Sequence, residues 1–444
     1  MEMRQGNLWK NMLLYSIPLM FTNLLQVFFN LADVAVVGKF AGPIPLGSVG
    51  STSILITLTT GLFLGVAGGV NSMTGFFIGA EEKENERKCV HTGFIICLAT
   101  GIIVLLGGIL LSRPVLELMG TKDELIEGAV LYFRIYMLGS PALAIYNYGN
   151  AILSAAGDTK KPLKYLAIAG VINIILNLIF VIGFGLDAAG VALASIISQY
   201  ISALLIFRAL IKADGDYRFS FSDLHFDSTI AARILKISIP AAIQFTLFAV
   251  ANLFVQSAVN SFDHVTVEGN SAAANADNIV YELMYACYTA CTTFIAQNYG
   301  ARKPDRVRKS YIIANTYSFI IGLVFGLLLY AFCNPFLLLF TSDRAVMAEG
   351  TKRVSVMAFS YCVSSFMDNA TAGCRGLGKT TVPTIIIVVG TVVFRIIWIY
   401  TIFAYFHTLQ SLYIMYPVVW ILTAIFEIGY FVIQYRKIFK EEIL

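Results

Sequence analysis

The chain has 444 residues, of which 58% are hydrophobic and only 13% carry a charge. A soluble domain typically has about 25% charged residues, so this composition excludes an ordinary soluble protein and indicates one that crosses a membrane many times. The net charge of +4 is small and carries little information until it is assigned to individual loops. The seven cysteines lie in or beside apolar runs without paired spacing, which is typical of packing residues and not of disulfides or a metal site.

Twelve apolar segments are long enough to cross a bilayer as helices, which requires about 20 residues each. They fall near residues 11–38, 50–78, 91–112, 128–156, 163–184 and 188–211, and after a polar stretch near 233–262, 272–298, 311–333, 349–377, 383–405 and 411–435. The sequence therefore predicts an all-α polytopic membrane protein built from two six-helix lobes. We expect an N-terminal lobe over residues 1–211, a cytoplasmic linker over 212–232 and a C-terminal lobe over 233–444.

The first apolar segment contains a proline and a carboxylate, both unusual inside a membrane helix. Pro18 cannot donate a hydrogen bond to the carbonyl of Leu14, so a bend is expected there. Asp33 is predicted to lie well inside the bilayer, where a carboxylate costs about 2.5–3.5 kcal/mol on insertion scales. Gln26 and Asn30 share its helix face. Two interpretations stay open: an acid neutralised against a neighbouring helix for packing, or a proton or cation site that controls the bend.

Lysine and arginine are distributed unequally between the two predicted sides of the membrane. The termini and alternate loops of one side hold 23 of the 31 Lys and Arg residues, whereas the other side holds six, among them Lys352 and Arg353. Arg134 and Arg395 fall inside helices. Because positive charge collects on the cytoplasmic side, we expect both termini in the cytoplasm and the protein in the plasma membrane.

The two halves repeat one another. Ser16-Ile17-Pro18 recurs as Ser238-Ile239-Pro240, Gly79-Ala80 recurs as Gly300-Ala301, and the stretch from Gly157 to Pro162 recurs from Gly378 to Pro383. Three anchors that keep nearly the same spacing indicate an internal duplication. Each half has an even number of helices, so both enter from the same side and the repeat is parallel, about a pseudo-two-fold axis along the membrane normal. Such an arrangement places a cavity between the lobes.

The whole chain resembles a multidrug and toxin extrusion (MATE) transporter of bacterial or archaeal type. The resemblance rests on the 6+6 helices, the proline-containing first helix with Gln26 and Asp33, the run Gln297-Asn-Tyr-Gly-Ala301, and the Gly-x-Thr-x-x-Pro turns after segments 128–156 and 349–377. It implies a secondary active antiporter that exports amphipathic or cationic compounds, such as drugs and toxins, in exchange for H⁺ or Na⁺. It also implies small-molecule substrates, contact with membrane lipids, a monomer, and neither nucleic-acid binding nor a cofactor beyond the coupling ion.

Polar residues in segments 163–184 and 188–211 can join Asp33. Asn173 and Asn177 lie one turn apart on one face, and Ser195 lies in the next segment. A carboxylate, two amides and a hydroxyl suit a hard cation such as Na⁺ and could equally hydrogen-bond a protonated acid, while polar packing between helices is the alternative. The resemblance implies an N-lobe cation and proton site on these positions, with Gln26 beside them. Some relatives have a second acid where this chain has Asn177, so Na⁺ and H⁺ both remain open.

The C-terminal half does not keep the acid, because the counterpart of Asp33 is Val255. Four other charged residues in its segments are candidates for a second site, and these are Asp368, Glu282, Arg395 and Asp277. Since an unpaired buried charge is costly, Arg395 is expected to neutralise one of these acids. Glu427 is expected to be structural.

In the expected cycle, Asp33 takes up a proton or Na⁺ from outside, and its neutralisation lets the first helix bend near Pro18 and release substrate. The alternative function is a lipid-linked oligosaccharide flippase of the same superfamily, but a diphosphate headgroup calls for several cationic residues in the spans. An enzyme or receptor is disfavoured. Residues 373–380 match a phosphate-binding loop, but they end a predicted span where such a loop must follow a strand.

Overall fold

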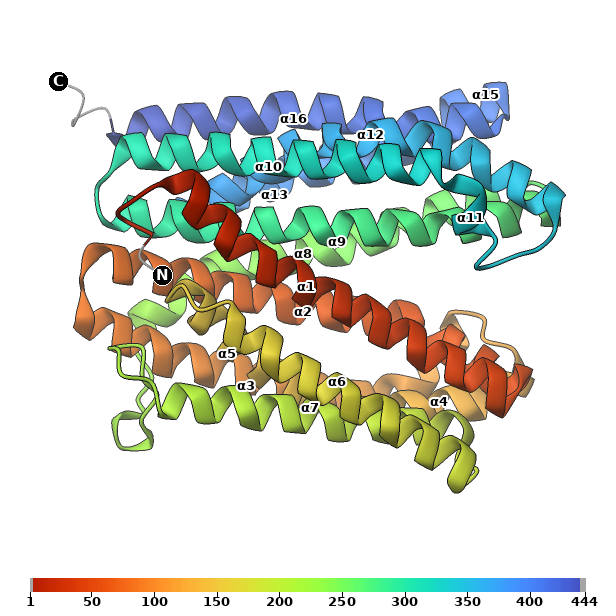
Figure 1. Cartoon of the computed structure of the whole chain (residues 1–444), viewed down its shortest axis with the longest axis horizontal. Coiled ribbons are helices and arrows are strands. Elements are labelled where there is room, and N and C mark those ends of the chain that lie inside the picture. Colours follow the sequence, from red (N-terminus) through yellow and green to blue (C-terminus); the bar gives the residue numbers. More distant parts are fainter. Residues whose placement is uncertain (1–2, 440–444) are drawn as a thin grey trace. The chain divides into compact units, whose positions relative to one another are not determined.

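The computed structural model describes residues 3–439, and it contains helices but no strand over that range. The chain forms two compact units. Unit 1 comprises residues 21–242, and unit 2 comprises residues 3–20 together with 243–439. The division falls inside α1 (Leu8–Val36) and α8 (Ser228–Val259), so each of these two helices begins in one unit and ends in the other (Figure 1).

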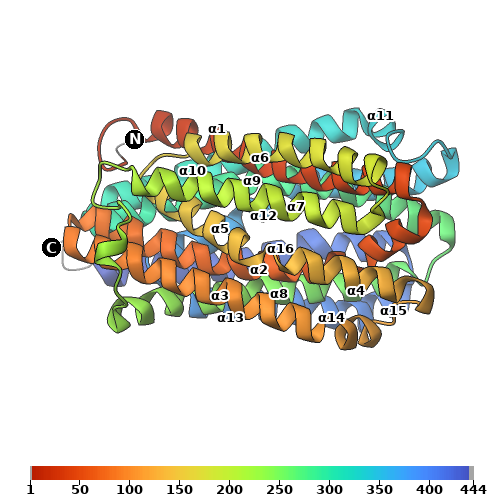
Figure 2. The ribbon, with the colours of Figure 1, turned by 90° about the horizontal axis from the view of Figure 1, so that it is seen from below.

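Unit 1 is a bundle of long helices. It contains most of α1, η1 (Val37–Ala41), α2 (Pro43–Ala80), α3 (Lys83–Leu118), α4 (Asp123–Met137), α5 (Ser140–Ala155), α6 (Lys160–Leu178), η2 (Ile179–Gly183), α7 (Asp187–Ile211), η3 (Phe221–Asp223) and the start of α8. Helix α5 packs against α2, α3 and α7, and α6 lies along α7 (Figure 2). Helices α4 and α5 meet at a bend of 45° and together have the length and composition of one span.

Unit 2 is built around α12. It contains the rest of α8, α9 (His264–Gly300), α10 (Pro304–Ala331), α11 (Cys333–Leu337), α12 (Arg344–Gly376), α13 (Thr381–Ile387), η4 (Val388–Val393), α14 (Phe394–Trp398), η5 (Ile399–Phe403), α15 (Ala404–Phe406) and α16 (Leu409–Phe439). Helix α12 packs against α9, α10 and α16. The start of α1 is held here, because the Tyr15 hydroxyl donates to Thr293 Oγ1 at 3.1 Å and its ring meets Phe294 edge-on.

The helices have the length and composition of membrane spans. Within residues 3–439, ten helices are long and apolar enough to cross a bilayer, and the bent α4–α5 pair makes eleven. The twelfth predicted span is α12, which has 33 residues but carries buried polar side chains such as Asp368 and Asn369. Its helix neighbours keep these groups out of lipid. Each predicted span therefore has a helical counterpart, and the all-α, two-lobed fold class is confirmed.

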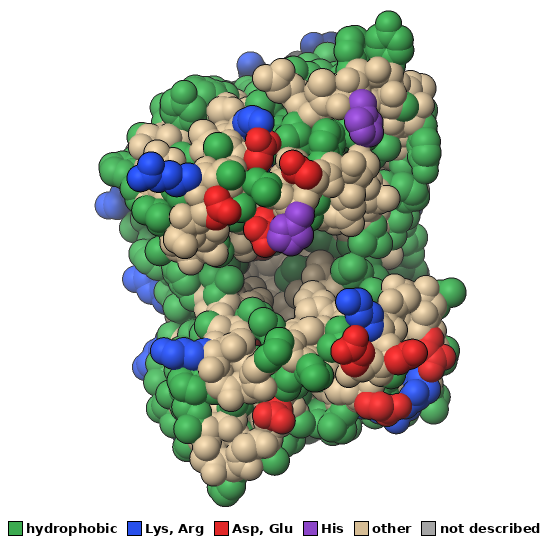
Figure 3. Space-filling view, turned by 90° about the vertical axis from the view of Figure 1, so that its right-hand side faces the viewer, with side chains coloured by type: hydrophobic (Ala, Val, Ile, Leu, Met, Phe, Trp, Pro, Cys, Tyr) green, Lys and Arg blue, Asp and Glu red, His purple; other side chains and the backbone are tan. Residues whose placement is uncertain are grey.

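Charged side chains gather at the ends of the helices. The end-on view shows acidic and basic groups across this face, while the flanks at its margins are largely hydrophobic (Figure 3). This pattern is typical of a multi-pass membrane protein, because water is available only beyond the ends of the spans.

The linker after α7 is tied to α3 within unit 1. Arg87 Nη2 donates to Asp216 Oδ1 at 2.7 Å, and Lys83 Nζ lies 3.4 Å from the other carboxylate oxygen. The hydrogen bond from Arg87 holds the pKa of Asp216 below its usual range. A lowered pKa means that these ion pairs are present at neutral pH and are lost only as the pH falls through that value. The segment joining the two sequence halves is thus anchored.

The repeated Gly-x-Thr-x-x-Pro turns end α5 and α12 in the same way. Gly157 has φ 87° and Gly378 has φ 70°, in the left-handed region that favours glycine. In each turn the amide after the glycine donates to the carbonyl five residues earlier at 2.8 Å. Residues 373–380 therefore close a helix, which is not the setting of a phosphate-binding loop.

Small residues let α2 approach the start of α8 in unit 1. A Cβ atom added at Gly65 would lie 2.6 Å from the backbone of Ala242, and the Ser238 hydroxyl donates to the carbonyl of Val66 at 3.1 Å. Gly61, Gly65 and Gly69 recur every four residues on α2, a spacing that predicts close helix packing, and at Gly65 the partner is α8.

We expect Gly65→Ala to lower the thermal stability of the purified protein, because α2 and α8 must separate to admit the new methyl group. The matched control is Gly50→Ala on the same helix, where an added Cβ meets no atom within 4 Å. That change should be neutral or slightly stabilising, since alanine favours helix by about 0.5–1 kcal/mol over glycine. Equal melting temperatures for the two variants would contradict the close contact.

Candidate ion-coupling site and substrate pocket

Asp33 in unit 1 lies in a closed ring of four hydrogen-bonded side chains. Asn177 Nδ2 donates to Asp33 Oδ1 at 2.5 Å and to Asn173 Oδ1 at 3.2 Å. Ser195 Oγ donates to Asp33 Oδ2 at 3.0 Å, and Asn173 Nδ2 donates to Ser195 Oγ at 3.4 Å. Helices α1, α6 and α7 each contribute to the ring, so the structure brings together four residues that the sequence distributes over three spans.

The ring contains one charge and only neutral donors. No lysine or arginine forms an ion pair with Asp33 in the part of the chain that the structure describes. Within the same described range, Asn177 Oδ1 is buried and has no hydrogen-bond partner. Because the oxygen and nitrogen of an amide can exchange places by rotation, this side chain can present an oxygen instead of a donor. The arrangement can accept one proton on the carboxylate or one small cation among its oxygens.

Two residues on the same face of α1 stay outside the ring. Gln26 is partly exposed and Asn30 is exposed, and over residues 3–439 neither makes a hydrogen bond. Sharing a helix face with Asp33 was therefore not sufficient to bring them to it. Pro18 lies in α1 two residues before the chain passes from unit 2 into unit 1, and Pro240 holds the equivalent position in α8.

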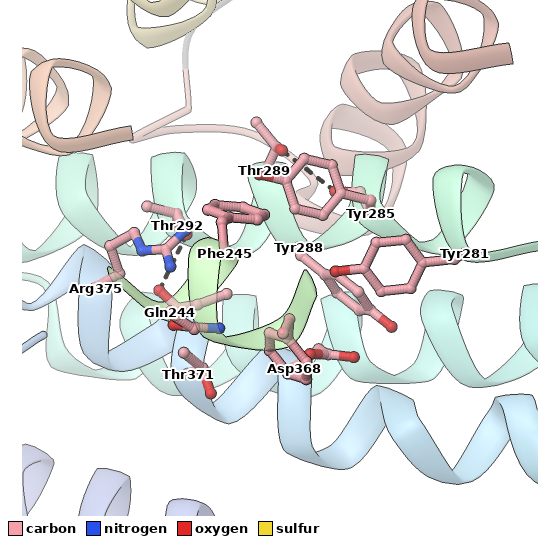
Figure 4. A pocket seen from close by; sticks show the side chains of 12 residues that line it. Gln244, Phe245, Tyr281, Tyr285, Tyr288, Thr289, Thr292, Asp368, Thr371 and Arg375 are labelled. Carbon is pink, nitrogen blue, oxygen red and sulfur yellow. Dashed lines mark hydrogen bonds between the residues drawn. The ribbon is translucent and has the colours of Figure 1, made fainter. Parts of the chain in front are cut away.

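Unit 2 contains a pocket between α8, α9 and α12 (Figure 4). One wall is the row Tyr281, Tyr285 and Tyr288 on α9, with adjacent ring centroids 5.9 and 6.1 Å apart. Asp368 and Arg375, seven residues apart on α12, also line it. The pocket thus combines aromatic faces with a carboxylate and a guanidinium. These tyrosines were not predicted from the sequence, although their i, i+4, i+7 spacing places them on one helix face and could have indicated the wall.

Asp277, one of the predicted C-lobe candidates, is paired with an arginine in the structure. Arg353 Nη2 and Nε donate to Asp277 Oδ2 at 2.5 and 3.2 Å, and the Tyr361 hydroxyl donates to the other oxygen. Arg353 Nη1 donates to Asn270 Oδ1 at 2.7 Å. Arg353 was counted with the charges of the non-cytoplasmic side, but α12 begins at Arg344 and leaves Arg353 6% exposed. Charge counting missed it because a charge in the first turns of a span looks like a loop charge.

The prediction that Arg395 neutralises one of the candidate acids is wrong. Its Nη1 donates to the neutral Asn252 Oδ1 at 3.1 Å, and its guanidinium lies 5.0 Å from the ring centroid of Tyr416. Asp368 lines the pocket, and the positive charge that interacts with it there is that of Arg375. Arg395 therefore belongs to another part of unit 2.

Glu427 in α16, which is expected to be structural, lies in the interior of unit 2. It is fully buried, and neither carboxyl oxygen has a hydrogen-bond partner within residues 3–439. The Thr371 hydroxyl nearby donates to the carbonyl of Met367 instead. Glu282 in α9 is partly exposed.

The duplicated helical spans and the buried acid define a class, that of multi-pass membrane transporters with internal repeats. The MatE family model matches residues 18–179 and 240–401, one match in each half. The chain belongs to the MatE family.

The chain is similar in sequence to known proteins over most of their length. The chain is 28% identical to the probable multidrug resistance protein YpnP of Bacillus subtilis, over 81% of this chain and 80% of that one. It is 25% identical to the probable multidrug resistance protein YoeA of the same organism, over 86% and 84%. The solved structure of MATE in the bent conformation superposes with a TM-score of 0.91 at 23% identity, over 100% of this chain and 98% of the other.

We expect Arg353→Met to destabilise the protein by about 3 kcal/mol, because the partly buried Asp277 loses its counter-charge and keeps only the Tyr361 hydroxyl as a partner. The double variant Arg353→Met with Asp277→Asn removes that charge and keeps an acceptor for Tyr361, so it should recover most of the loss. Thermal unfolding in detergent measures both. A double variant that is as unstable as the single one would show that the ion pair is not the source of the stability.

Proposed function

We propose that this protein is a secondary active multidrug efflux transporter that exports amphipathic, often cationic, organic compounds in exchange for H⁺ or Na⁺. The observation that carries the proposal is the hydrogen-bonded ring around Asp33, whose one charge has only neutral donors. The MatE family and the multidrug resistance names of the relatives support the transport of organic compounds. The excess of Lys and Arg on one side favours insertion into the plasma membrane with both termini cytoplasmic.

The coupling step is the neutralisation of Asp33. While it is charged, the carboxylate holds the Asn177 and Ser195 donors toward itself. A proton or Na⁺ removes the need for one or both donors, and the ring rearranges. Helix α1 joins this site to Pro18, where a backbone hydrogen bond is missing and bending costs little. Binding of a proton or Na⁺ at Asp33 thereby changes the bend of α1 near Pro18, where the chain passes from unit 2 into unit 1.

Energy for export comes from the gradient of the exchanged ion. One elementary charge moving down 100 mV supplies about 2.3 kcal/mol, which is nearly two decades of concentration ratio. Coupling requires that substrate and ion favour different conformations, because a ligand that binds both equally shifts nothing. When a monocation leaves in exchange for one proton, the voltage contributions cancel and only the pH gradient drives export.

The pocket of unit 2 supplies the surface for the organic compound. Tyrosine rings bind apolar and aromatic faces and attract cations through their π electrons. Asp368 adds a negative charge for an amine, and flat aromatic walls tolerate many shapes. Broad selectivity for amphipathic molecules follows from such a lining.

We expect Asp33→Asn to abolish gradient-driven efflux while the protein still folds, because an amide has nearly the same shape but cannot gain or lose the charge. The assay is dye efflux from proteoliposomes under an imposed pH gradient or an imposed Na⁺ gradient, each alone. The gradient that drives the wild type identifies the ion. Asp187→Asn is the matched control, since Asp187 is an exposed acid of unit 1 at a left-handed position that asparagine tolerates. Normal efflux by Asp33→Asn would refute the proposed coupling step.

We expect Asp368→Asn to weaken substrate binding severalfold while ion-driven transport persists at saturating substrate. Asp368 lines the pocket of unit 2, while the ring around Asp33 in unit 1 stays intact. Transport rates against substrate concentration separate the two effects, because a pocket residue raises KM and a coupling residue lowers kcat under every gradient. Complete loss of coupling in Asp368→Asn, with Asp33→Asn still coupled, would assign the coupling site to unit 2.

A further inference from the structure

Arg395 occupies the position in unit 2 that Asn173 occupies in unit 1. The two matches to the family model begin at Pro18 and Pro240 and run in parallel, so these two prolines set the register of the repeat. Counting equally far from each proline, Asn173-Ile-Ile corresponds to Arg395-Ile-Ile. The repeated prolines Pro162 and Pro383 are separated by one residue fewer than Pro18 and Pro240. The π-helical turn η4 lies between Pro383 and Arg395. A π turn accommodates one additional residue, so it accounts for the change of register.

The other members of the Asp33 ring are also replaced. On the same register Asp33 corresponds to Val255, and Ser195 corresponds to Pro417. Asn177 corresponds to Ile399. Asn30, which lies outside the ring in unit 1, is retained as Asn252, and Asn252 accepts the hydrogen bond from Arg395. The duplication has therefore exchanged one negative charge in unit 1 for one positive charge in unit 2.

This positive charge is buried without a counter-charge. Arg395 is 3% exposed and forms no ion pair with any acid among the residues described. Its contacts are one hydrogen bond to a neutral amide and the face of Tyr416, which Arg353 shares at 5.5 Å. Arg353 is already paired with Asp277, so that acid is occupied. Within the same described residues the Arg395 Nε atom has no acceptor.

Such an environment compensates only part of the charge, because an ion removed from water needs an opposite charge or several hydrogen bonds to replace its hydration. Asn252 is exposed, so the guanidinium lies beneath a side chain at the surface of unit 2. Asn252 accepts from Nη1, on the edge of the guanidinium away from Nε. The Nε donor, on the other edge, is therefore left for a further acceptor.

We propose that unit 2 binds a monovalent anion at Arg395, in the region of the repeat where unit 1 carries the ring around Asp33. The anion accepts from Nε and its charge neutralises the guanidinium, while Asn252 keeps its hydrogen bond from Nη1. Two sources offer this chemistry, a free halide and the carboxylate of an organic compound that enters the protein. The inference does not rest on the proposed exchange of substrate for H⁺ or Na⁺.

The test is thermal unfolding of the purified full chain in detergent at constant ionic strength. Sodium gluconate, whose anion is bulky and strongly hydrated, is replaced stepwise by chloride, bromide or benzoate. A bound anion raises the melting temperature along a saturable curve, because it stabilises only the folded state. We expect a saturable rise of a few degrees in the wild type and in Arg134→Gln, and none in Arg395→Gln. A response to halides identifies a free anion, and a response to benzoate alone identifies an organic carboxylate.

A second variant tests the site even where Arg395→Gln does not fold. Val255→Asp places a carboxylate one turn beyond Asn252, at the position of the acid in unit 1. It should remove the anion response and raise the melting temperature in gluconate, because Arg395 gains an internal partner. The control Val259→Asp, one turn further and fully buried, should lower stability and keep the anion response. No saturable response in the wild type, or an unchanged response in Val255→Asp, would overturn the proposal.

Discussion

The central physical constraint on this protein is that a charge inside a bilayer must be matched by another charge or by several hydrogen bonds. Unit 1 meets it at Asp33 with donors from Asn177 and Ser195, and Asn173 in turn donates to Ser195. Unit 2 meets it at Asp277 with an arginine and a tyrosine hydroxyl, an arrangement that leaves the acid permanently paired. A carboxylate that is held only by neutral donors can bind and release a neutralising ion during a cycle, because no fixed positive charge occupies it. The difference between these two acids thus separates a group that can carry an exchangeable ion from one that holds helices together.

Much of this could be predicted from the sequence, because the strongest signals are periodic or repeated. Apolar length indicated twelve spans, and the recurring prolines and glycines indicated the duplication. Asp33, Asn173, Asn177 and Ser195 could be grouped because few polar residues interrupt those spans, so their partners were limited. Unit 2 was harder for the opposite reason. Its helices carry many polar side chains, and spacing along one helix does not say which neighbouring helix it meets. Arg353 could therefore not be matched to Asp277, nor Arg395 to Asn252.

Duplication followed by divergence explains why the two units differ in chemistry while sharing a fold. The elements that shape the backbone are retained in both halves, including the prolines of α1 and α8 and the left-handed glycines after α5 and α12. The side chains inside each bundle were replaced more freely. Unit 1 kept a polar ring, whereas unit 2 acquired an arginine, a tyrosine row and an isolated Glu427. Backbone geometry tolerates little change because it fixes where each helix ends, but one buried polar group can be exchanged for another.

The helices shared between the units have a consequence for the order in which the protein can assemble. The start of α8 packs against the glycines of α2, so unit 1 is incomplete until residue 242 has left the ribosome. The first residues of α1 belong with α9 and α10, which are synthesised later. The first residues of α1 therefore lack their packing partners until the later helices have been synthesised. Separately expressed sequence halves would each lack a helical segment of their own core, and each would expose the surface that the missing segment covers.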